Sequence, residues 1–524
     1  MKKLFNNKFN VVFLVPFLLG AITVFGFSPF NFTLINFFSF SILLFLILIL
    51  KKKTQSNYRK KKSYRYFFYL GCSFGYGFFL AGNYWISISL THDEIFKGLI
   101  PISLLVIPLF LSLFFGAAIL VASPFIKQNI SFVLLFSLIF TIFEFLRGNI
   151  LTGFPWNLIS YTWSWSIETI QLLSLFGTYS FSLITITFFC IPFLFLNKQI
   201  DKKNIFFLSF FLMMFFINYI YGLNKINNDK YSFDKNISIK IVSPNFTLKD
   251  YKLKSEMKQL MRLIKISNPD ENKKTLFIWP EGIFYESYLE DIIRYKKLFK
   301  ENFSESHLIA LGITSSAESS SSSDKKYFNS LVILNNKLDV LALYKKINLV
   351  PLGEFLPYEN FLSRLGLKKI TQGYNSFSSG SKREIINLGN TFNGKLILPL
   401  ICYEIIYSGD IKKSNQLPDL VVNISEDAWF GKSIGPHQHF AKAIYRAVEE
   451  GVFIARSANK GVSAIIDPNG QVIKSLNTGE SGNIELNFPN YYKSNLFSNY
   501  GNKIFFLIIF LYIFLILIFK KFKI

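Results

Sequence analysis

The chain is poor in the residues that build disulfide frameworks and metal sites. It has three cysteines and four histidines in 524 residues. Three cysteines cannot form a disulfide framework. Cys72 and Cys190 lie in apolar runs, where we expect them to act as small core side chains. His437 and His439, with no nearby thiol, give a weak zinc signal, and we expect neither a metal nor a cofactor. Cys402 lies in mixed sequence and needs another explanation.

Acidic residues are also scarce. The chain has 33 Asp and Glu against 57 Lys and Arg, which gives a formal net charge of +24. Such an excess is typical of proteins that bind nucleic acid or anionic surfaces. Much of it, however, lies in clusters beside apolar runs, and no basic-aromatic module is visible. We therefore expect membrane topology to explain the charge, and we expect no nucleic-acid partner.

Apolar residues dominate residues 1–225, whereas residues 235–490 have the composition of a soluble domain. A helix that crosses the hydrocarbon core of a membrane needs about 20 mostly apolar residues. Eight segments are candidates, seven before the soluble stretch and one after it: 11–28, 33–50, 66–90, 99–123, 130–147, 168–196, 204–222 and 503–519. No small-residue cleavage site follows the first segment, which we interpret as an uncleaved span.

The loops between these segments alternate in charge. Basic residues gather at both termini, near Lys127 and in the loops 51–65 and 198–203. Lys and Arg are almost absent from the opposite loops, 29–32, 91–98 and 148–167. Because positively charged loops remain in the cytoplasm, this pattern predicts eight spans with both termini in the cytoplasm. It also predicts that the soluble domain lies outside the cytoplasm.

Glu144 and Arg147 are ionisable residues near the outer end of the span 130–147. A charge at this depth indicates a functional site. An ion pair at positions i and i+3 that anchors the end of the helix fits equally well. Both interpretations remain open, and the pair is a candidate for substrate binding.

The soluble stretch alternates strand-like runs with helical patterns, which predicts an α/β domain. Strand-like runs are 237–242, 275–279, 307–313, 330–334, 340–344, 395–401, 420–424, 452–456 and 462–467. Helical patterns cover 253–266, 289–301 and 437–450. We expect the Ser-rich segment 315–324 to be a flexible loop or an insertion, and 467–470 to be a hairpin turn.

Three reactive side chains stand at the ends of strand-like runs: Glu281, Lys346 and Cys402. A thiolate is a good nucleophile. A partly buried glutamate can take the thiol proton, and a lysine can stabilise the oxyanion of a tetrahedral intermediate. Each residue alone is compatible with an ordinary buried cysteine or a solvated surface charge. Together they predict an acyl-transfer site that needs no histidine.

Longer motifs surround these residues: Trp279–Glu281, Tyr344–Phe355, Cys402–Glu404 and Asn423–Gly431, with Gly82–Trp85 and Thr152–Trp156 in the apolar part. In these motifs residues 235–490 resemble the nitrilase (carbon–nitrogen hydrolase) superfamily, whose members carry a Glu-Lys-Cys triad on an α-β-β-α sandwich. The whole chain resembles the apolipoprotein N-acyltransferases, which catalyse the last step of bacterial lipoprotein maturation. The resemblance implies a polytopic helical membrane domain (1–225), a periplasmic nitrilase-like domain (235–490) and a C-terminal span (503–519).

The resemblance also implies roles for individual residues. Glu281 matches the general base, Lys346 the oxyanion lysine and Cys402 the nucleophile. The residues that match supporting positions are Glu354, Tyr403 and Glu404. The family usually follows the first domain strand with a Trp that lines the active-site mouth, but Asn245–Tyr251 lacks it. Tyr251 is the nearest aromatic residue, and it and Trp429 are candidates for substrate binding.

The implied reaction transfers a fatty acyl chain through a Cys402 thioester. The donor would be a phospholipid, with phosphatidylethanolamine expected, and the acceptor the α-amine of a diacylglyceryl-cysteine lipoprotein. The resemblance implies the bacterial inner membrane, and we expect a monomer. The main alternative is a membrane-tethered amidase or nitrilase that uses water as second nucleophile. A transporter with an accessory domain is disfavoured by the near absence of charge within the spans.

Overall fold

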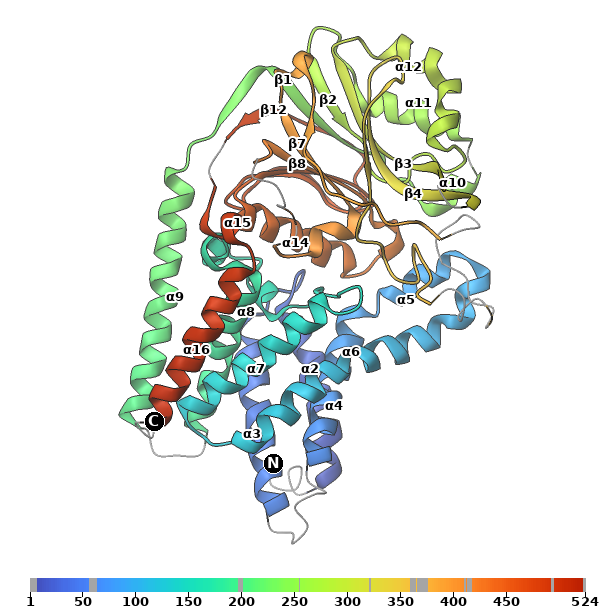
Figure 1. Cartoon of the computed structure of the whole chain (residues 1–524). Coiled ribbons are helices and arrows are strands. Elements are labelled where there is room, and N and C mark those ends of the chain that lie inside the picture. Colours follow the sequence, from blue (N-terminus) through green and yellow to red (C-terminus); the bar gives the residue numbers. More distant parts are fainter. Residues whose placement is uncertain are drawn as a thin grey trace. The chain divides into compact units, whose positions relative to one another are not determined.

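The computed structural model describes residues 7–55, 64–196, 201–253, 255–319, 322–358, 364, 376–409, 411, 417–491 and 494–521. The chain divides into two compact units (Figure 1). Unit 1 contains Met1–Asn228 and Asn495–Ile524, and unit 2 contains Asp229–Ser494. In the sequence, the second unit is therefore inserted before the C-terminal segment Asn495–Ile524 of the first.

Unit 1 is built from helices. The principal ones are α2 (Val15–Thr23), α3 (Ile35–Gln55), α4 (Tyr64–Asn83), α5 (Ile86–Ser89), α6 (Ile100–Ala122), α7 (Ile130–Asn149), α8 (Leu173–Cys190), α9 (Lys202–Asn228), α15 (Leu496–Tyr500) and α16 (Lys503–Lys521). Among the residues that the structure describes, six helical stretches are long and apolar enough to cross a membrane: Ile35–Thr54, Glu94–Phe125, Ile130–Asn149, Thr169–Phe195, Lys202–Asn228 and Lys503–Lys521.

The expected number of eight spans is therefore approximate. Within the described residues, the first expected span is the shorter apolar helix Asn10–Gly26, and the third corresponds to α4. Several glycines and tyrosines make α4 less apolar than its neighbours. The glycines have a packing reason, since a Cβ on Gly71 or Gly77 would collide with the backbone carbonyls of Phe115 or Phe17. Small residues allow helices to approach this closely.

Unit 2 contains two six-stranded sheets (Figure 1). The first has the order β12-β1-β2-β3-β4-β5, with β1 (Ser232–Ser243), β2 (Lys274–Ile278), β3 (His307–Ser319), β4 (Ser322–Leu334), β5 (Val340–Lys345) and β12 (Gly482–Asn490). The second has the order β11-β10-β9-β8-β7-β6, with β6 (Ile386–Asn387), β7 (Leu396–Ile401), β8 (Leu420–Glu426), β9 (Phe453–Asn459), β10 (Ser463–Ile466) and β11 (Val472–Leu476).

The two sheets face each other and helices cover their outer faces. Residues from both sheets share one buried apolar cluster, which includes Ile278, Ile333, Ile401 and Val422. A second cluster joins the outer face of the first sheet to α11 (Glu256–Ser267) and α12 (Lys296–Asn302). Helix α14 (Gly435–Glu450) contacts β9 and β10 of the second sheet. This is an α/β domain, as the sequence predicted, with the α-β-β-α sandwich that the family resemblance implied.

Parallel pairing places the ends of the central strands together. In the first sheet β1, β2 and β3 are parallel, and in the second β7, β8 and β9 are parallel. The carboxyl ends of parallel strands meet at one edge of a sheet, which is where α/β proteins bind ligands. The predicted hairpin turn is confirmed, since Gly470 donates its backbone N–H to the Asp467 carbonyl between β10 and β11.

The prediction for the Ser-rich segment 315–324 is wrong in its described part. Ser315–Ser319 continue β3, and the residues from Ser322 begin β4. Backbone pairing extends to Glu318 opposite Lys325, two side chains of opposite charge that favour this register. A run of serines shows no alternation of apolar and polar residues, which is the pattern that predicts a strand. The sequence therefore did not reveal these strand residues.

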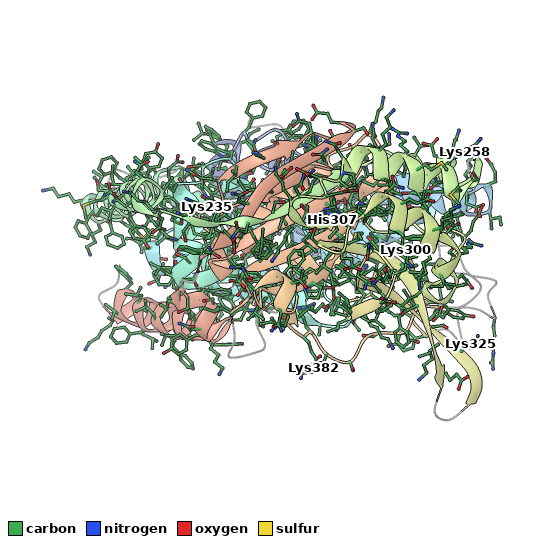
Figure 2. All side chains as sticks on the ribbon, turned by 90° about the horizontal axis from the view of Figure 1, so that it is seen from above. Lys235, Lys258, Lys300, His307, Lys325 and Lys382 are labelled. Atoms are coloured by element: carbon green, nitrogen blue, oxygen red, sulfur yellow. The ribbon has the colours of Figure 1, made fainter. Side chains whose placement is uncertain are left out.

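Basic side chains of unit 2 project from several different elements (Figure 2). The exposed lysines labelled there are Lys235 on β1, Lys258 on α11, Lys300 on α12, Lys325 on β4 and Lys382 in a loop. His307, in contrast, is buried at the start of β3 and accepts a hydrogen bond from the Ser304 backbone. The positive charge of this unit is thus distributed and not gathered on one element.

Candidate active site

The three predicted reactive residues come together in unit 2, each at the end of a strand. Cys402 directly follows β7, Lys346 directly follows β5, and Glu281 lies three residues after β2. Glu281 and Lys346 come from the first sheet and Cys402 from the second. The site therefore lies where strand ends of the two sheets meet.

Lys346 is held by two carboxylates. Its Nζ lies 2.9 Å from Glu354 Oε1 and 3.7 Å from Glu281 Oε1, and the residue is only 1% exposed. Asn329 on β4 donates from Nδ2 to both carboxylates, at 2.7 Å in each case. Burial opposes the lysine charge, but Glu354 and Glu281 outweigh it and raise the pKa of Lys346. The lysine is therefore a fixed ammonium.

Glu281 has the environment of a general base. Burial raises the pKa of its carboxyl, and the charge of Lys346 partly offsets this rise. Its Oε2 accepts the backbone N–H of Glu426 at 3.1 Å, and the Cys402 thiol is a hydrogen-bonding neighbour. A carboxylate with a raised pKa next to a thiol can take the thiol proton as the sulfur attacks.

Cys402 sits on a strained turn. Its φ is 49°, in the left-handed region that few non-glycine residues adopt, and such strain gathers at functional sites. The residue is partly buried. Burial and the nearby Glu281 carboxylate raise the pKa of the thiol well above its usual value. Cys402 therefore rests as a thiol, and a base would have to take its proton for the sulfur to attack.

Glu404 joins the nucleophile turn to the lysine segment. Its Oε2 accepts the Ile401 backbone N–H at 2.9 Å, while its Oε1 accepts the Ile347 backbone N–H at 3.0 Å. Arg383 Nη2 forms a buried ion pair with the same Oε1 at 3.0 Å. Glu404 thereby fixes Cys402 relative to Lys346. Tyr403, the residue after the nucleophile, is 7% exposed.

Tyr251 lies beside the site but not in an open mouth. It is 3% exposed, stacks on Tyr285 with ring centroids 5.7 Å apart, and donates its hydroxyl to Glu426 Oε2 at 3.0 Å. Trp429, on the turn after β8, is partly exposed. Among the two aromatic candidates, Trp429 is the one with surface available to a substrate.

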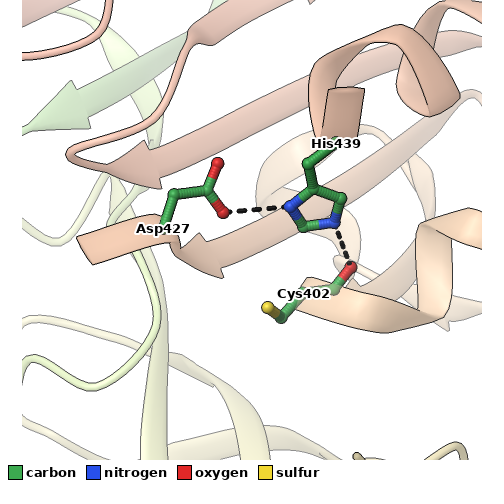
Figure 3. A group of neighbouring side chains, drawn as sticks. All are labelled: Cys402, Asp427 and His439. Atoms are coloured by element: carbon green, nitrogen blue, oxygen red, sulfur yellow. Dashed lines mark hydrogen bonds and ion pairs between the residues drawn. The ribbon is translucent and has the colours of Figure 1, made fainter. Parts of the chain in front are cut away.

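A buried charge network lies behind Cys402 (Figure 3). His439 Nε2 is 3.3 Å from the Cys402 carbonyl oxygen, and His439 Nδ1 is 3.0 Å from Asp427 Oδ1. Arg456 Nη2 donates to Asp427 Oδ2 at 2.9 Å and lies 3.1 Å from His439 Nδ1. Arg456 and His439 outweigh burial and lower the pKa of Asp427 to about 2. The network braces the nucleophile turn.

The same three side chains have donor atoms close enough for a metal ion. The Cys402 sulfur, an Asp427 oxygen and a His439 nitrogen lie within 4.8 Å of one another. The guanidinium of Arg456 already neutralises Asp427 and touches the His439 ring. A cation placed among these groups would be repelled by Arg456, so the donor set does not suit a metal.

Glu144 and Arg147 belong to α7 of unit 1 and are both buried. Glu144 accepts the Ile159 backbone N–H at 3.0 Å and the Ser182 hydroxyl at 2.5 Å. Arg147 donates to the carbonyls of Phe154 and Asn157. These contacts hold the loop that follows α7, which favours the structural interpretation of the pair.

Sequence patterns missed several residues of the site. Four polar residues in strands or loops belong to the site only because they form hydrogen bonds with distant segments. They are Asn329, Arg383, Glu426 and Asn459. His439 was considered only as a metal ligand. A polar residue at the end of a strand, such as Asn459 in β9, was the available signal.

Known proteins resemble the chain over nearly its whole length. A family model described as the apolipoprotein N-acyltransferase N-terminal domain matches residues 19–191, and one described as carbon–nitrogen hydrolase matches residues 297–488. The apolipoprotein N-acyltransferase of Rickettsia bellii is 34% identical over 463 residues, which cover 87% of this chain and 90% of that protein. The chain belongs to the apolipoprotein N-acyltransferase family.

Other relatives agree with this assignment. The apolipoprotein N-acyltransferase of Bradyrhizobium diazoefficiens is 29% identical over 499 residues, covering 93% of this chain and 91% of that protein. Among solved structures, Nit3 of Saccharomyces cerevisiae, a nitrilase-superfamily member, is 16% identical with a TM-score of 0.34, covering 49% of this chain and 93% of that chain. As a family member, the protein is a bacterial membrane enzyme that N-acylates lipoproteins, with lipid and lipoprotein substrates.

Proposed function

We propose that the enzyme takes an acyl chain from a phospholipid, with phosphatidylethanolamine as the expected donor, and holds it as a thioester on Cys402. The acceptor is the α-amine of a diacylglyceryl-cysteine N-terminus. The observation that carries this proposal is the meeting of the Cys402 thiol, the Glu281 carboxylate and the Lys346 ammonium at strand ends of two sheets. Glu354, Tyr403 and Glu404 position these groups.

The proton balances through Glu281 in both half-reactions. As Cys402 Sγ attacks the ester carbonyl, Glu281 takes the thiol proton, and Lys346 stabilises the oxyanion. The tetrahedral intermediate collapses, the ester C–O bond breaks, and Glu281 protonates the leaving lysophospholipid alcohol. The amine then attacks the thioester. Glu281 takes a proton from its nitrogen and returns one to the Cys402 thiolate as the C–S bond breaks.

The charge pattern of the loops supports a placement for this chemistry. We infer an inner-membrane protein with both termini in the cytoplasm and unit 2 in the periplasm, acting as a monomer without a nucleic-acid partner. Both substrates are lipids that present their reactive groups at a membrane surface. Trp429 is the proposed substrate contact in unit 2. Within unit 1, Glu144 and Arg147 hold the loop after α7.

The acyl-enzyme gives a direct test. Purified full-length protein incubated with acyl-labelled phosphatidylethanolamine should acquire a label that neutral hydroxylamine removes, because hydroxylamine cleaves thioesters. Cys402→Ala should abolish this label, since no other described thiol lies in unit 2. Cys190→Ala is the matched control, because Cys190 is a buried thiol of unit 1, and it should keep the label. Label that persists on Cys402→Ala would refute the assignment of the nucleophile.

A further inference from the structure

Glu426, the last residue of β8, is a buried carboxyl with only neutral partners among the residues that the structure describes. It is 5% exposed. Its Oε1 accepts the Ala428 backbone N–H at 3.0 Å, and Asn459 Nδ2 lies 2.9 Å from both oxygens. The Tyr251 hydroxyl lies 3.0 Å from Oε2. An isolated buried carboxylate is costly, and such groups tend to keep a proton.

Glu426 is also tied to the proposed base. Its backbone N–H donates to Glu281 Oε2 at 3.1 Å, so the two residues are joined by a direct hydrogen bond. The two carboxyls feel each other electrostatically, and each disfavours ionisation of the other. Two carboxyls coupled in this way titrate as a pair and do not lose both protons readily.

The neighbouring charges are already compensated. Lys346 contacts Glu354 at 2.9 Å and Glu281 at 3.7 Å, which leaves Glu426 as the carboxyl without an ammonium partner in the described part of the site. Asp427, the next residue, is neutralised by Arg456 on β9. On α10 (Leu248–Leu253), the carboxylate of Asp250 accepts from Thr247.

We propose that Glu426 is a positioning residue of acyl transfer, which stays protonated in the working enzyme and so leaves Glu281 as the single ionised base. Ionisation of Glu426 places a second negative charge beside Glu281, where it opposes the developing thiolate and oxyanion. The inference rests on the proposed role of Glu281 and adds a residue that acts through it.

The direction of the pH dependence follows. Burial raises the pKa of Glu426 to about 8. The residue is neutral below this value and ionises as the pH rises through it. Acyl-enzyme formation should therefore fall on the alkaline side. A single ionisation with this midpoint leaves about one tenth of the enzyme in the neutral form one pH unit above it, which corresponds to a loss of about tenfold.

The test is the pH profile of acyl-enzyme formation by the full-length protein. Single-turnover rates with labelled phosphatidylethanolamine in detergent micelles are measured between pH 5.5 and 9.5. Glu426→Gln mimics the protonated carboxyl permanently, because its amide is neutral and donates toward Tyr251. We expect this variant to match the wild type near pH 7 and to lose the alkaline decline, so that it is about tenfold faster at pH 9.

A second variant keeps the proposal testable if Glu426→Gln does not fold. Tyr251→Phe keeps the ring packing but removes a donor that favours the ionised form of Glu426, so the alkaline decline should move to higher pH. Asp467→Asn is the matched control, since Asp467 is another buried acid of unit 2, in the β10–β11 turn. Its profile should equal that of the wild type.

The outcomes separate this inference from the proposed function. Glu281→Gln should form no acyl-enzyme at any pH, and label on that variant would overturn the role of Glu281 itself. If Glu281→Gln is inactive while wild type, Glu426→Gln and Tyr251→Phe share one alkaline midpoint, only the role of Glu426 is refuted. A wild type without any decline up to pH 9.5 refutes it equally.

Discussion

Two adjacent lysines at the end of β5 have different surroundings. Lys345 extends over the ring of Phe328, with Nζ 4.0 Å from the centroid. Lys346 points the other way, into the pair of carboxylates, because successive side chains of a strand alternate between its faces. Only Lys346 can therefore reach an oxyanion at Cys402. The family resemblance implied the same lysine.

Asn329 gives a sharp prediction at the scale of a single residue. Its amide bridges Glu281 and Glu354, and Asn329→Ala removes the 2.7 Å hydrogen bond to Glu281 Oε1. A lost hydrogen bond to a charged group costs about 1.5–3 kcal/mol. We expect acyl-enzyme formation to slow by about 10- to 100-fold, measured as the single-turnover rate with labelled phospholipid.

The control for this prediction is Asn335→Ala. Asn335 is an asparagine in the turn between β4 and β5, where it caps the backbone of Lys337 and Asp339 away from the site. Its substitution should leave the rate of acylation unchanged. Equal rates for Asn329→Ala and wild type would mean that the bridge does not hold Glu281 in place.

At the scale of elements, strand β3 packs against the backbone of Glu281 at Gly312. A Cβ at this position would lie 2.8 Å from Glu281 Cα and 3.0 Å from Ile424 Cδ1. Gly312→Ala should destabilise unit 2 by about 1–3 kcal/mol through overpacking. Displacement of the base should also reduce the acylation rate by about 100-fold.

Gly482→Ala is the control for strand glycines. A Cβ there meets only Leu476 Cδ2 at 3.5 Å, an ordinary contact. The two variants are compared by their thermal unfolding and by their single-turnover rates of acylation. A fully active Gly312→Ala enzyme would show that β3 and the Glu281 segment do not pack as tightly as described.

Strand ends were the part of the architecture that the sequence predicted well. Apolar runs over 275–279, 340–344 and 395–401 correspond to β2, β5 and β7, and the reactive residues follow them. Strands β2 and β7 are mostly buried, so hydrophobic runs mark them, whereas β5 is apolar but largely exposed. The predicted hairpin turn at 467–470 implied β11 but not its bounds, because that strand is almost entirely exposed. Strand β12 was not predicted, because it is only partly buried.

Contacts between distant segments could not be predicted. The hydrogen bond from Tyr251 to Glu426 joins residues 175 positions apart. We expected Tyr251 near an open mouth, because it stands close to the position of the family's tryptophan. Its burial depends on Tyr285 and Glu426, which come from other segments of the domain. No local pattern carries such information.

At the scale of the whole molecule, the chain combines two units with different stabilising forces. Unit 1 has buried polar residues that hydrogen-bond to one another, such as Glu144 and Ser182. Its helices also pack closely at glycines such as Gly77. Unit 2 has a large apolar core between two sheets. The hydropathy pattern separates the two, and its count of about eight spans is approximate, since packing glycines lower the hydropathy of α4.

The predicted topology leads to a test on the intact cell. Lys300 on α12 and Lys52 on α3 are both exposed, and the charge pattern places them on opposite sides of the membrane. In a cysteine-free background, Lys300→Cys should react with a membrane-impermeant maleimide on intact spheroplasts. Lys52→Cys should react only after permeabilisation. If only the Lys52→Cys variant is labelled on intact spheroplasts, unit 2 lies in the cytoplasm and the proposed orientation is wrong.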